Sequence, residues 1–162
     1  EYASPPARPA ISARNTTNQH LLRCKKIMFD GEKTTKTILV VDDEQTITEL
    51  LHIALEDEGY EVICAHDGQD AMQKVEEEHP DLIICDLLMP HMNGEQFYCA
   101  LKQSSDHHTI PVVLMSGSQN MHVARKHAFD GFLAKPFDVE TLFRKIRLVA
   151  PYAGGIGDHR AW

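Results

Sequence analysis

Positive charge is in short supply in this sequence. Its 162 residues include 24 Asp and Glu against 16 Lys and Arg, which gives a formal net charge of −8. Proteins that bind nucleic acid in bulk use basic patches to neutralise phosphates. The composition therefore argues against direct nucleic-acid binding, and it suits a protein whose acidic side chains gather around a cation.

Paired cysteines and long apolar runs are also missing. No C-x-x-C pair and no zinc-finger spacing to histidine occurs among the four cysteines, which are Cys24, Cys64, Cys85 and Cys99. We therefore expect reduced, structural thiols and a cytoplasmic location. No apolar stretch approaches the ~20 residues of a membrane-spanning helix. The N-terminus lacks the apolar core of a signal peptide, so we expect no membrane partner.

Composition divides the chain into three parts. Residues 1–35 are rich in Pro, Ala, Ser, Thr and Asn and show no apolar period, so we expect a disordered leader, either native or introduced by cloning. Residues 36–149 carry regular apolar patterning and should form one folded domain. Residues 150–162 are glycine-rich and are expected to form a flexible tail.

Apolar runs alternate with amphipathic segments through the predicted domain. We expect strands over residues 37–41, 60–65, 81–85, 110–115 and 131–134. We expect helices over residues 44–59, 67–79, 94–103, 119–128 and 138–149. A helix between each pair of strands favours parallel pairing, so the predicted fold is α/β, with a five-stranded parallel sheet between helices.

Polar side chains follow four of the predicted strands. Asp42 and Asp43 follow the first, Asp86 the third, Ser116 the fourth and Lys135 the fifth. The carboxyl ends of parallel strands share one edge of the sheet, where ligands of α/β proteins bind. We therefore expect these side chains to converge on one crevice.

The chemistry of this set points to phosphoryl transfer. Carboxylates suit Mg²⁺, which in proteins takes one or two of them plus waters and phosphate oxygens. Asp86 can attack phosphorus as a nucleophile and form an aspartyl phosphate. Lys135 and Ser116 supply an ammonium and a hydroxyl for the phosphoryl oxygens. Each residue alone has an ordinary alternative role, such as Asp43 capping a helix.

The motifs LVVDDE, DLIICDLLMPHMNGEQF, VVLMSG and GFLAKPF, taken in order, resemble the receiver domain of two-component response regulators. The resemblance covers about residues 36–149 and implies a flavodoxin-like strand order, 2-1-3-4-5. It implies that Asp86 is the phosphoacceptor, and that Mg²⁺ or Mn²⁺ binds Asp43, Asp86 and the backbone carbonyl of Leu88. Asp42 would act mainly through water.

The same resemblance assigns roles around the phosphoryl group. Ser116 and Lys135 would bind its oxygens, Phe132 would be the aromatic switch residue, and Pro136 would follow a cis peptide bond. A histidine kinase or a His-phosphotransfer protein would donate the phosphoryl group, and an unidentified output partner would receive the signal. The protein would then be a signalling switch that catalyses only its own phosphorylation and dephosphorylation.

Two other functions compete with this one. Phosphatases that form an aspartyl phosphate carry a second acid two positions after the nucleophile, where this chain has Leu88. A receiver-like interaction module that is never phosphorylated would not need the complete set of Asp43, Asp86, Ser116 and Lys135.

Two departures from the family pattern lead to expectations. The interval from Ser116 to Lys135 is about three residues shorter than usual, nearly one helical turn, so the helix within 119–128 should be short or distorted. We expect the signalling face that this helix helps to build to be altered. Leu88 offers no polar group to orient water and Ser118 only a hydroxyl, so the aspartyl phosphate should hydrolyse slowly.

Overall fold

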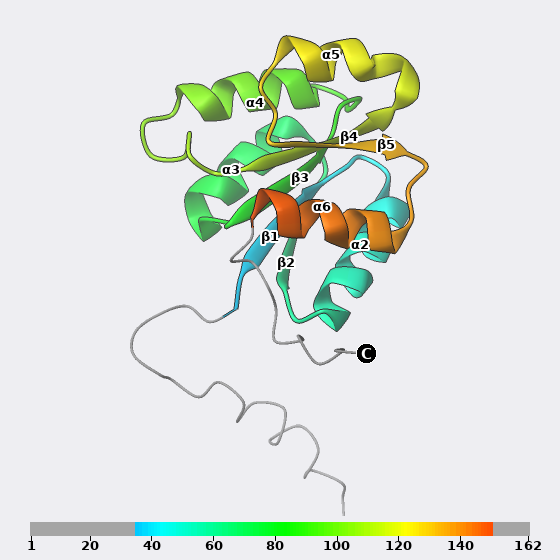
Figure 1. The fold of residues 1–162 in the computed structure, drawn as a ribbon. Helices are drawn as coiled ribbons and strands as arrows, with labels where there is room; N and C mark the ends of the chain where they lie inside the picture. The colour runs from blue at the N-terminus through cyan, green and yellow to red at the C-terminus, as the bar shows by residue number, and fades with distance from the viewer. Residues whose placement is uncertain (1–34, 151–162) are drawn as a thin grey trace, which may run out of the picture. The chain divides into compact units, whose positions relative to one another are not determined.

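A computed structural model of the chain describes residues 35–150 (Figure 1). The predictions about residues 1–34 and 151–162 lie outside this range. The strands are β1 (Thr37–Val41), β2 (Glu61–Ala65), β3 (Leu82–Asp86), β4 (Val112–Gly117) and β5 (Gly131–Lys135). The helices are α2 (Gln45–Asp57), α3 (Gly68–Glu78), α4 (Gly94–Gln103), the 3₁₀ turn η1 (Ser118–Asn120), α5 (Met121–Lys126) and α6 (Val139–Val149).

The five strands form one parallel sheet in the order β2-β1-β3-β4-β5. This confirms the predicted fold class and strand order. The chain passes from β1 to β2 on one side and then to β3 on the other, so strand order reverses between β1 and β3. That reversal opens a crevice at the carboxyl ends of these two strands.

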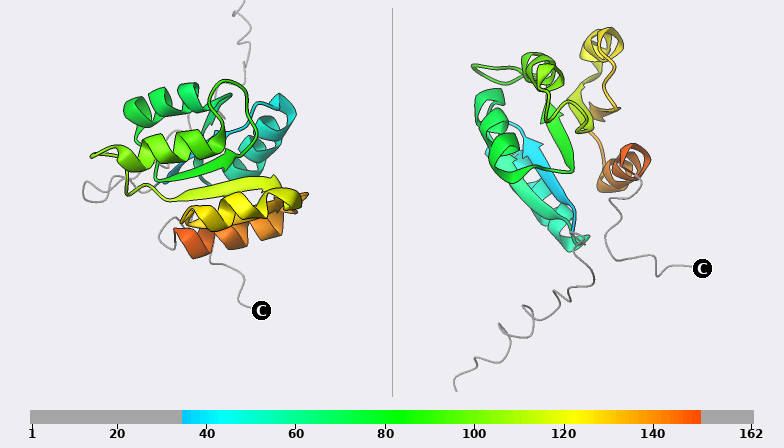
Figure 2. Two further views of the ribbon diagram at one scale, coloured as in Figure 1. Left: turned by 90° about the horizontal axis from the view of Figure 1, so that it is seen from above. Right: turned by 90° about the vertical axis from the view of Figure 1, so that its left-hand side faces the viewer.

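The sheet is buried on both faces, as its continuous apolar runs predict. Ile38 and Val40 of β1 face a core shared with α2 and α6, whereas Leu39 and Val41 face a core shared with α3 and α4. Figure 2 shows helices on both sides of the sheet. All five residues of β1 are buried, so its position is fixed by packing from both sides.

Side-chain caps set where three of the helices begin. Asp67 accepts hydrogen bonds from the backbone N–H groups of Gln69 and Asp70 at the start of α3. Asn93 and Gln96 form a reciprocal capping box at the start of α4. Asp138 accepts from the backbone N–H of Thr141 at the start of α6. These caps satisfy backbone donors that have no partner within the helix.

The α5 helix has six residues and follows a three-residue 3₁₀ turn. This confirms the expectation of a short helix between β4 and β5. Val123 is its buried anchor and packs with Leu87 and Leu114, next to the partly buried Phe129 and Phe132. With six residues, α5 offers fewer positions for packing against the sheet than α2, which has 13, or α6, which has 11.

Candidate phosphoryl-transfer site

The predicted polar residues converge at the carboxyl edge of the sheet. Asp42 follows β1 directly, Asp86 ends β3, Ser116 lies near the end of β4 and Lys135 ends β5. Asp42, Asp86 and Ser116 are buried, with 1%, 6% and 2% of their surfaces exposed. Buried polar groups are retained where other polar groups meet them, so this edge is a built site rather than a surface cluster.

Lys135 connects the two buried carboxylates. Its Nζ lies 2.7 Å from Oδ2 of Asp42 and 2.6 Å from Oδ1 of Asp86. Asp42 also accepts a hydrogen bond of 2.9 Å from the backbone N–H of Glu44. One ammonium thus serves two carboxylates from different strands, which is why both can be buried so close together.

The second oxygen of Asp86 is held by the loop that follows β3. Its Oδ2 accepts a hydrogen bond of 2.6 Å from the backbone N–H of Leu88. The loop then turns back, and the backbone N–H of Gly94 donates to the carbonyl of Leu87 at 3.0 Å. A Cβ at Gly94 would collide with the carbonyl oxygen of Asp86, so glycine allows α4 to begin this close to the carboxylate.

The surroundings of Asp86 and Lys135 shift their proton affinities. Burial raises the pKa of Asp86 above its usual value, Lys135 opposes this shift, and the neighbouring Asp42 adds to it. Burial disfavours the charged form of Lys135, but its hydrogen bonds to Asp42 and Asp86 outweigh burial and raise its pKa. The site therefore holds a charged lysine beside a carboxylate that its environment renders unusually basic.

Asp43 and Leu88 are exposed, in contrast to the buried Asp42 and Asp86. Asp43 is exposed, and the Leu88 side chain is 63% exposed. The helix cap proposed as an alternative role for Asp43 is wrong, because Glu44 occupies the N-cap of α2 and no side chain caps it. Asp43 is thus an exposed carboxylate next to the buried Asp42.

The donor set fits a magnesium ion only if backbone or water oxygens complete it. Within residues 35–150, no three acidic, histidine or cysteine side chains lie close enough together to enclose a metal. Mg²⁺ commonly binds one or two carboxylates and keeps several waters, so it does not need a three-carboxylate cage. The oxygens of Asp43, Asp86 and the Leu88 carbonyl are of the type it prefers.

Ser116 has a partner that the sequence analysis missed. Nδ2 of Asn120 donates a hydrogen bond of 3.0 Å to Oγ of Ser116. Asn120 lies four residues later, at the end of η1, so the 3₁₀ turn folds its amide back over the strand end. The spacing in the sequence offered no signal for this contact, because it depends on how tightly η1 turns.

Phe132 and Pro136 lie on either side of Lys135 along the chain. The Phe132 ring packs beside Leu114 and Val123 on the α5 side of the sheet and is half-buried. The Lys135–Pro136 peptide bond is cis.

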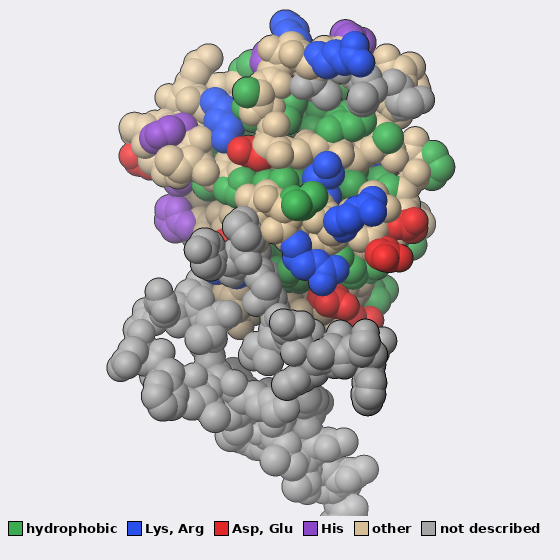
Figure 3. Space-filling model, viewed as in Figure 1, with side chains coloured by type: hydrophobic (Ala, Val, Ile, Leu, Met, Phe, Trp, Pro, Cys, Tyr) green, Lys and Arg blue, Asp and Glu red, His purple; other side chains and the backbone are tan. Residues whose placement is uncertain are grey.

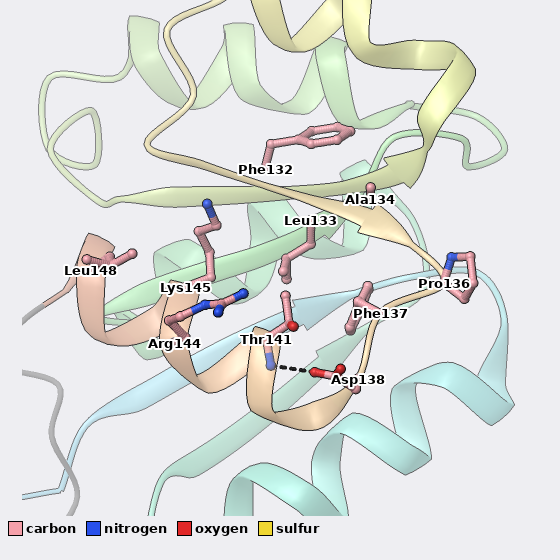
Figure 4. A pocket seen from close by; sticks show the side chains of 10 residues that line it. All are labelled: Phe132, Leu133, Ala134, Pro136, Phe137, Asp138, Thr141, Arg144, Lys145 and Leu148. Atoms are coloured by element: carbon pink, nitrogen blue, oxygen red, sulfur yellow. Dashed lines mark hydrogen bonds between the residues drawn. The ribbon is translucent and has the colours of Figure 1, made fainter.

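A groove of about 290 Å³ lies between β5 and α6 (Figure 4). Its apolar lining includes Leu133 and Phe137, and Arg144 and Lys145 of α6 lie along it. Figure 3 shows Lys and Arg side chains on this face of the molecule. The groove contains neither Asp42 nor Asp86, so it is separate from the acidic site.

The cysteines of the described region are free thiols. Cys85 is fully buried, whereas Cys64 and Cys99 are half-buried. Burial raises the pKa of the Cys85 thiol, with Asp86 and Asp42 adding to the shift. No helix between residues 35 and 150 is long and apolar enough to cross a membrane.

A family model described as the response regulator receiver domain matches residues 38–147. Among curated proteins, the response regulator ArlR of Staphylococcus aureus strain Mu50 is 33% identical over 112 residues, which cover 69% of this chain and 51% of ArlR. The chain thus spans about half the length of the curated relatives it matches.

Solved structures give the same result. A putative response regulator from Chloroflexus aurantiacus is 29% identical, with a TM-score of 0.67, covering 72% of this chain and 98% of that one. The chemotaxis response regulator CheY4 of Vibrio cholerae is 31% identical, with a TM-score of 0.67 and coverage of 71% and 98%. The signal receiver domain of a histidine kinase from Syntrophus aciditrophicus is 30% identical, with a TM-score of 0.67 and coverage of 79% and 97%.

Proposed function

Because the chain belongs to the response regulator receiver domain family, we propose that it is a phospho-accepting switch in which Asp86 takes up the phosphoryl group. The observation that carries this proposal is the contact of Lys135 with both Asp42 and Asp86 at the carboxyl edge of the sheet. The two buried carboxylates lie at the edge of the sheet where α/β proteins bind their ligands, and Lys135 offsets the cost of burying them there.

Receiver domains of two-component systems are signalling switches, and they work with a histidine kinase or a phosphotransfer protein. They bind Mg²⁺ at the site of phosphorylation. For this chain, the donor would be a phosphohistidine on such a partner.

The transfer requires Asp86 to be ionised and its attacking oxygen to be free. An oxygen of the Asp86 carboxylate forms a bond to phosphorus while the bond between phosphorus and the histidine nitrogen breaks, and the departing imidazole takes up a proton. The N–H of Leu88 holds Oδ2 of Asp86 at 2.6 Å, which orients the carboxylate. Lys135 would exchange its contact with Oδ1 for the incoming phosphoryl oxygens.

Asp43, Asp86 and the Leu88 carbonyl would hold the metal ion, with Asp42 acting mainly through water. Mg²⁺, when bound, neutralises charge on the transferring phosphoryl group. Asp43 suits this role because its exposed carboxylate can meet an ion without breaking an existing contact.

The switch would follow from the new charge. The hydroxyl of Ser116 would leave the amide of Asn120 and donate to the phosphoryl oxygens, which draws the end of β4 inward. Phe132 is only half-buried and would move into the space that Ser116 leaves. Phosphorylation then biases an existing equilibrium between two arrangements.

The functional unit that we propose spans residues 36–149, and its location is the cytoplasm. The free thiols of Cys64, Cys85 and Cys99 agree with that compartment. As a switch, the protein would catalyse only the gain and loss of its own phosphoryl group.

Intact-mass measurement after incubation with Mg²⁺ and acetyl phosphate tests the proposal. We expect one phosphoryl adduct on the wild-type chain, none on Asp86→Ala, and an unchanged adduct on Asp57→Ala, which alters an exposed residue of α2. An adduct that persists in Asp86→Ala would refute the assignment. Catalytic turnover of the phosphodonor would favour a hydrolase, and the absence of any adduct would favour an interaction module.

A further inference from the structure

A cysteine, a histidine and a glutamate form a short chain of contacts between α2 and β2. Sγ of Cys64 lies 3.7 Å from Nδ1 of His52. On the other side of the same ring, Nε2 of His52 lies 3.3 Å from Oε2 of Glu56. The imidazole therefore has a thiol at one nitrogen and a carboxylate at the other. The proposed phosphoryl-transfer chemistry uses none of these residues.

The contacts are accessible from solvent. The side chains of His52 and Glu56 are 37% and 56% exposed, and Cys64 is half-buried. Strand β2, which carries Cys64, lies at the edge of the sheet and pairs with β1 alone. The contact is thus open to solvent on the side of His52, whereas Cys64 also packs against the core.

The separation of the thiol and the imidazole suits a shared zinc ion. Zinc binds thiolate sulfur at about 2.3 Å and imidazole nitrogen at about 2.0–2.1 Å in tetrahedral geometry, which places the two ligand atoms about 3.6 Å apart. The observed 3.7 Å between Sγ and Nδ1 is close to that value. Metal-binding histidines usually donate their other ring N–H to a carboxylate, the position that Glu56 occupies.

We propose that Cys64 and His52 form a binding site for Zn²⁺, with Glu56 as the residue that orients the imidazole. Zinc would displace the thiol proton, bind Sγ and Nδ1, and fill its remaining positions with water or a group from another molecule. Within residues 35–150 no three potential ligands are grouped around one point, so this is a site of two protein ligands.

The environment of Cys64 limits the affinity. Burial raises the pKa of the thiol; Lys74 opposes the shift and Glu56 adds to it. Zinc must therefore compete with a firmly held proton. We expect weaker binding than at a closed structural site with four protein ligands, and the competing arrangement is one in which the thiol only donates a hydrogen bond to Nδ1.

Cobalt(II) as a spectroscopic substitute for zinc separates the two alternatives. On the full-length chain, we expect a thiolate-to-cobalt charge-transfer band whose intensity follows a one-site binding curve and reaches its plateau in excess cobalt. The band should disappear in Cys64→Ser. It should persist in Cys99→Ser, which removes the other half-buried cysteine, and in Cys24→Ser.

The cobalt affinities of variants at His52 and Glu56 test the roles proposed for these two residues. Glu56→Gln should weaken cobalt binding by about tenfold, as expected when the partner of a metal-bound imidazole is changed. His52→Gln should weaken binding at least as much. Zinc should also raise the thermal unfolding midpoint of the wild-type chain and of Cys99→Ser, but not that of Cys64→Ser.

The proposal fails if the wild-type chain shows no charge-transfer band or if Cys64→Ser retains it. It also fails if His52→Gln binds cobalt as tightly as the wild type, because the site would then be a lone thiol. Circular dichroism of each variant distinguishes loss of binding from loss of folding. None of these readouts depends on phosphorylation of Asp86.

Discussion

Asp86 carries a charge that its surroundings oppose. Burial and the neighbouring Asp42 favour its protonated form, and Lys135 compensates only in part, so its pKa in the folded state lies above the usual 3.8. A carboxylate with a raised pKa remains a better base and a stronger nucleophile once ionised. Keeping Asp86 ionised in the folded domain therefore lowers the stability of that domain.

Because the buried charge of Asp86 destabilises the folded state, the Asp86→Asn variant should differ from the wild type in how its thermal stability depends on pH. A raised folded-state pKa means that the contribution of Asp86 to stability is fully present below about 3.8 and is lost as pH rises through the folded-state value. The Asp86→Asn variant, whose amide stays neutral, escapes that loss. We expect its thermal unfolding midpoint to match that of the wild type at low pH and to exceed it at pH 7, as measured by circular dichroism.

Asp57→Asn, on the exposed surface of α2, is the matched control and should show no such pH-dependent difference. If Asp86→Asn were less stable than the wild type at neutral pH, the pairing with Lys135 would outweigh burial. That result would contradict the sign of the argument.

We expect Leu88 to influence a second property of the site, the lifetime of the proposed aspartyl phosphate. Its exposed, apolar side chain cannot orient a water molecule for attack on the aspartyl phosphate. We expect slow hydrolysis in the wild type and severalfold faster hydrolysis in Leu88→Asn, followed by intact mass after the phosphodonor is removed. Leu88→Met keeps the position apolar, and fast decay in both variants would exclude the role assigned to residue 88.

Among the elements, α5 depends most on contacts with its neighbours. Its last residue, Lys126, and the following His127 both contact Oε1 of Glu95 in the first turn of α4, at 2.6 and 2.7 Å. The His127 ring also lies edge-on to Tyr98 and Phe129. A six-residue helix is too short to be stable by itself, so these contacts hold its C-terminal end.

Glu95→Gln should loosen α5. Hydrogen bonds from Lys126 and His127 lower the pKa of Glu95, so the stability that its charge contributes is present above its usual 4.5 and is lost as pH falls through the lowered value. We expect faster amide hydrogen exchange in residues 121–126 of Glu95→Gln at neutral pH, with the difference from wild type shrinking as Glu95 protonates.

Glu49→Gln is the control, because Glu49 makes a comparable exposed contact with Gln45 on α2. It should leave exchange in α5 unchanged. Equal exchange in Glu95→Gln and the wild type would show that the charge of Glu95 does not hold the helix in place.

The elements were predictable because their patterns are strong. Runs such as Thr37–Val41 are buried on both faces, and the helices carry apolar residues at helical spacing. Boundaries moved by a residue where a cap took the first predicted position, as at α3, which begins at Gly68 because Asp67 is its N-cap. The helix predicted over 94–103 is confirmed as α4, Gly94–Gln103. The short interval between Ser116 and Lys135 predicted that α5 would be short, but not that it would run only from Met121 to Lys126.

The site was predictable in outline but not in its contacts. Parallel strands necessarily bring their ends to one edge, so Asp86 and Lys135 could be expected to meet there. The sequence could not say which of the adjacent acids, Asp42 or Asp43, would be buried, because strand alternation stops at the end of β1. Nor could it show that Asn120 reaches Ser116, since that contact arises from the local turn.

For the folded domain as a whole, stability depends on two apolar layers, one on each face of the sheet. Phe97 of α4 is fully buried in one of them, whereas Leu148 of α6 is 72% exposed. Phe97→Ala should lower the free energy of unfolding by about 3–5 kcal/mol, because it leaves a cavity that the core cannot fill. Urea denaturation followed by circular dichroism measures the change.

Leu148→Ala removes a similar apolar group from the surface and should change the free energy of unfolding by no more than about 0.5 kcal/mol. Comparable losses in the two variants would mean that Leu148 is covered in solution. Such a result would be inconsistent with the exposed position of that side chain.

The bond from Lys135 to Asp42 joins positions 93 residues apart, one near the beginning of the domain and the other near its end. A chain emerging from the ribosome makes its acidic pair early and its neutralising ammonium last. During synthesis, the half-made domain carries uncompensated negative charge at the future carboxyl edge of its sheet, and the addition of β5 neutralises part of it. The two carboxylates thus lack the ammonium that they share until β5 has been synthesised.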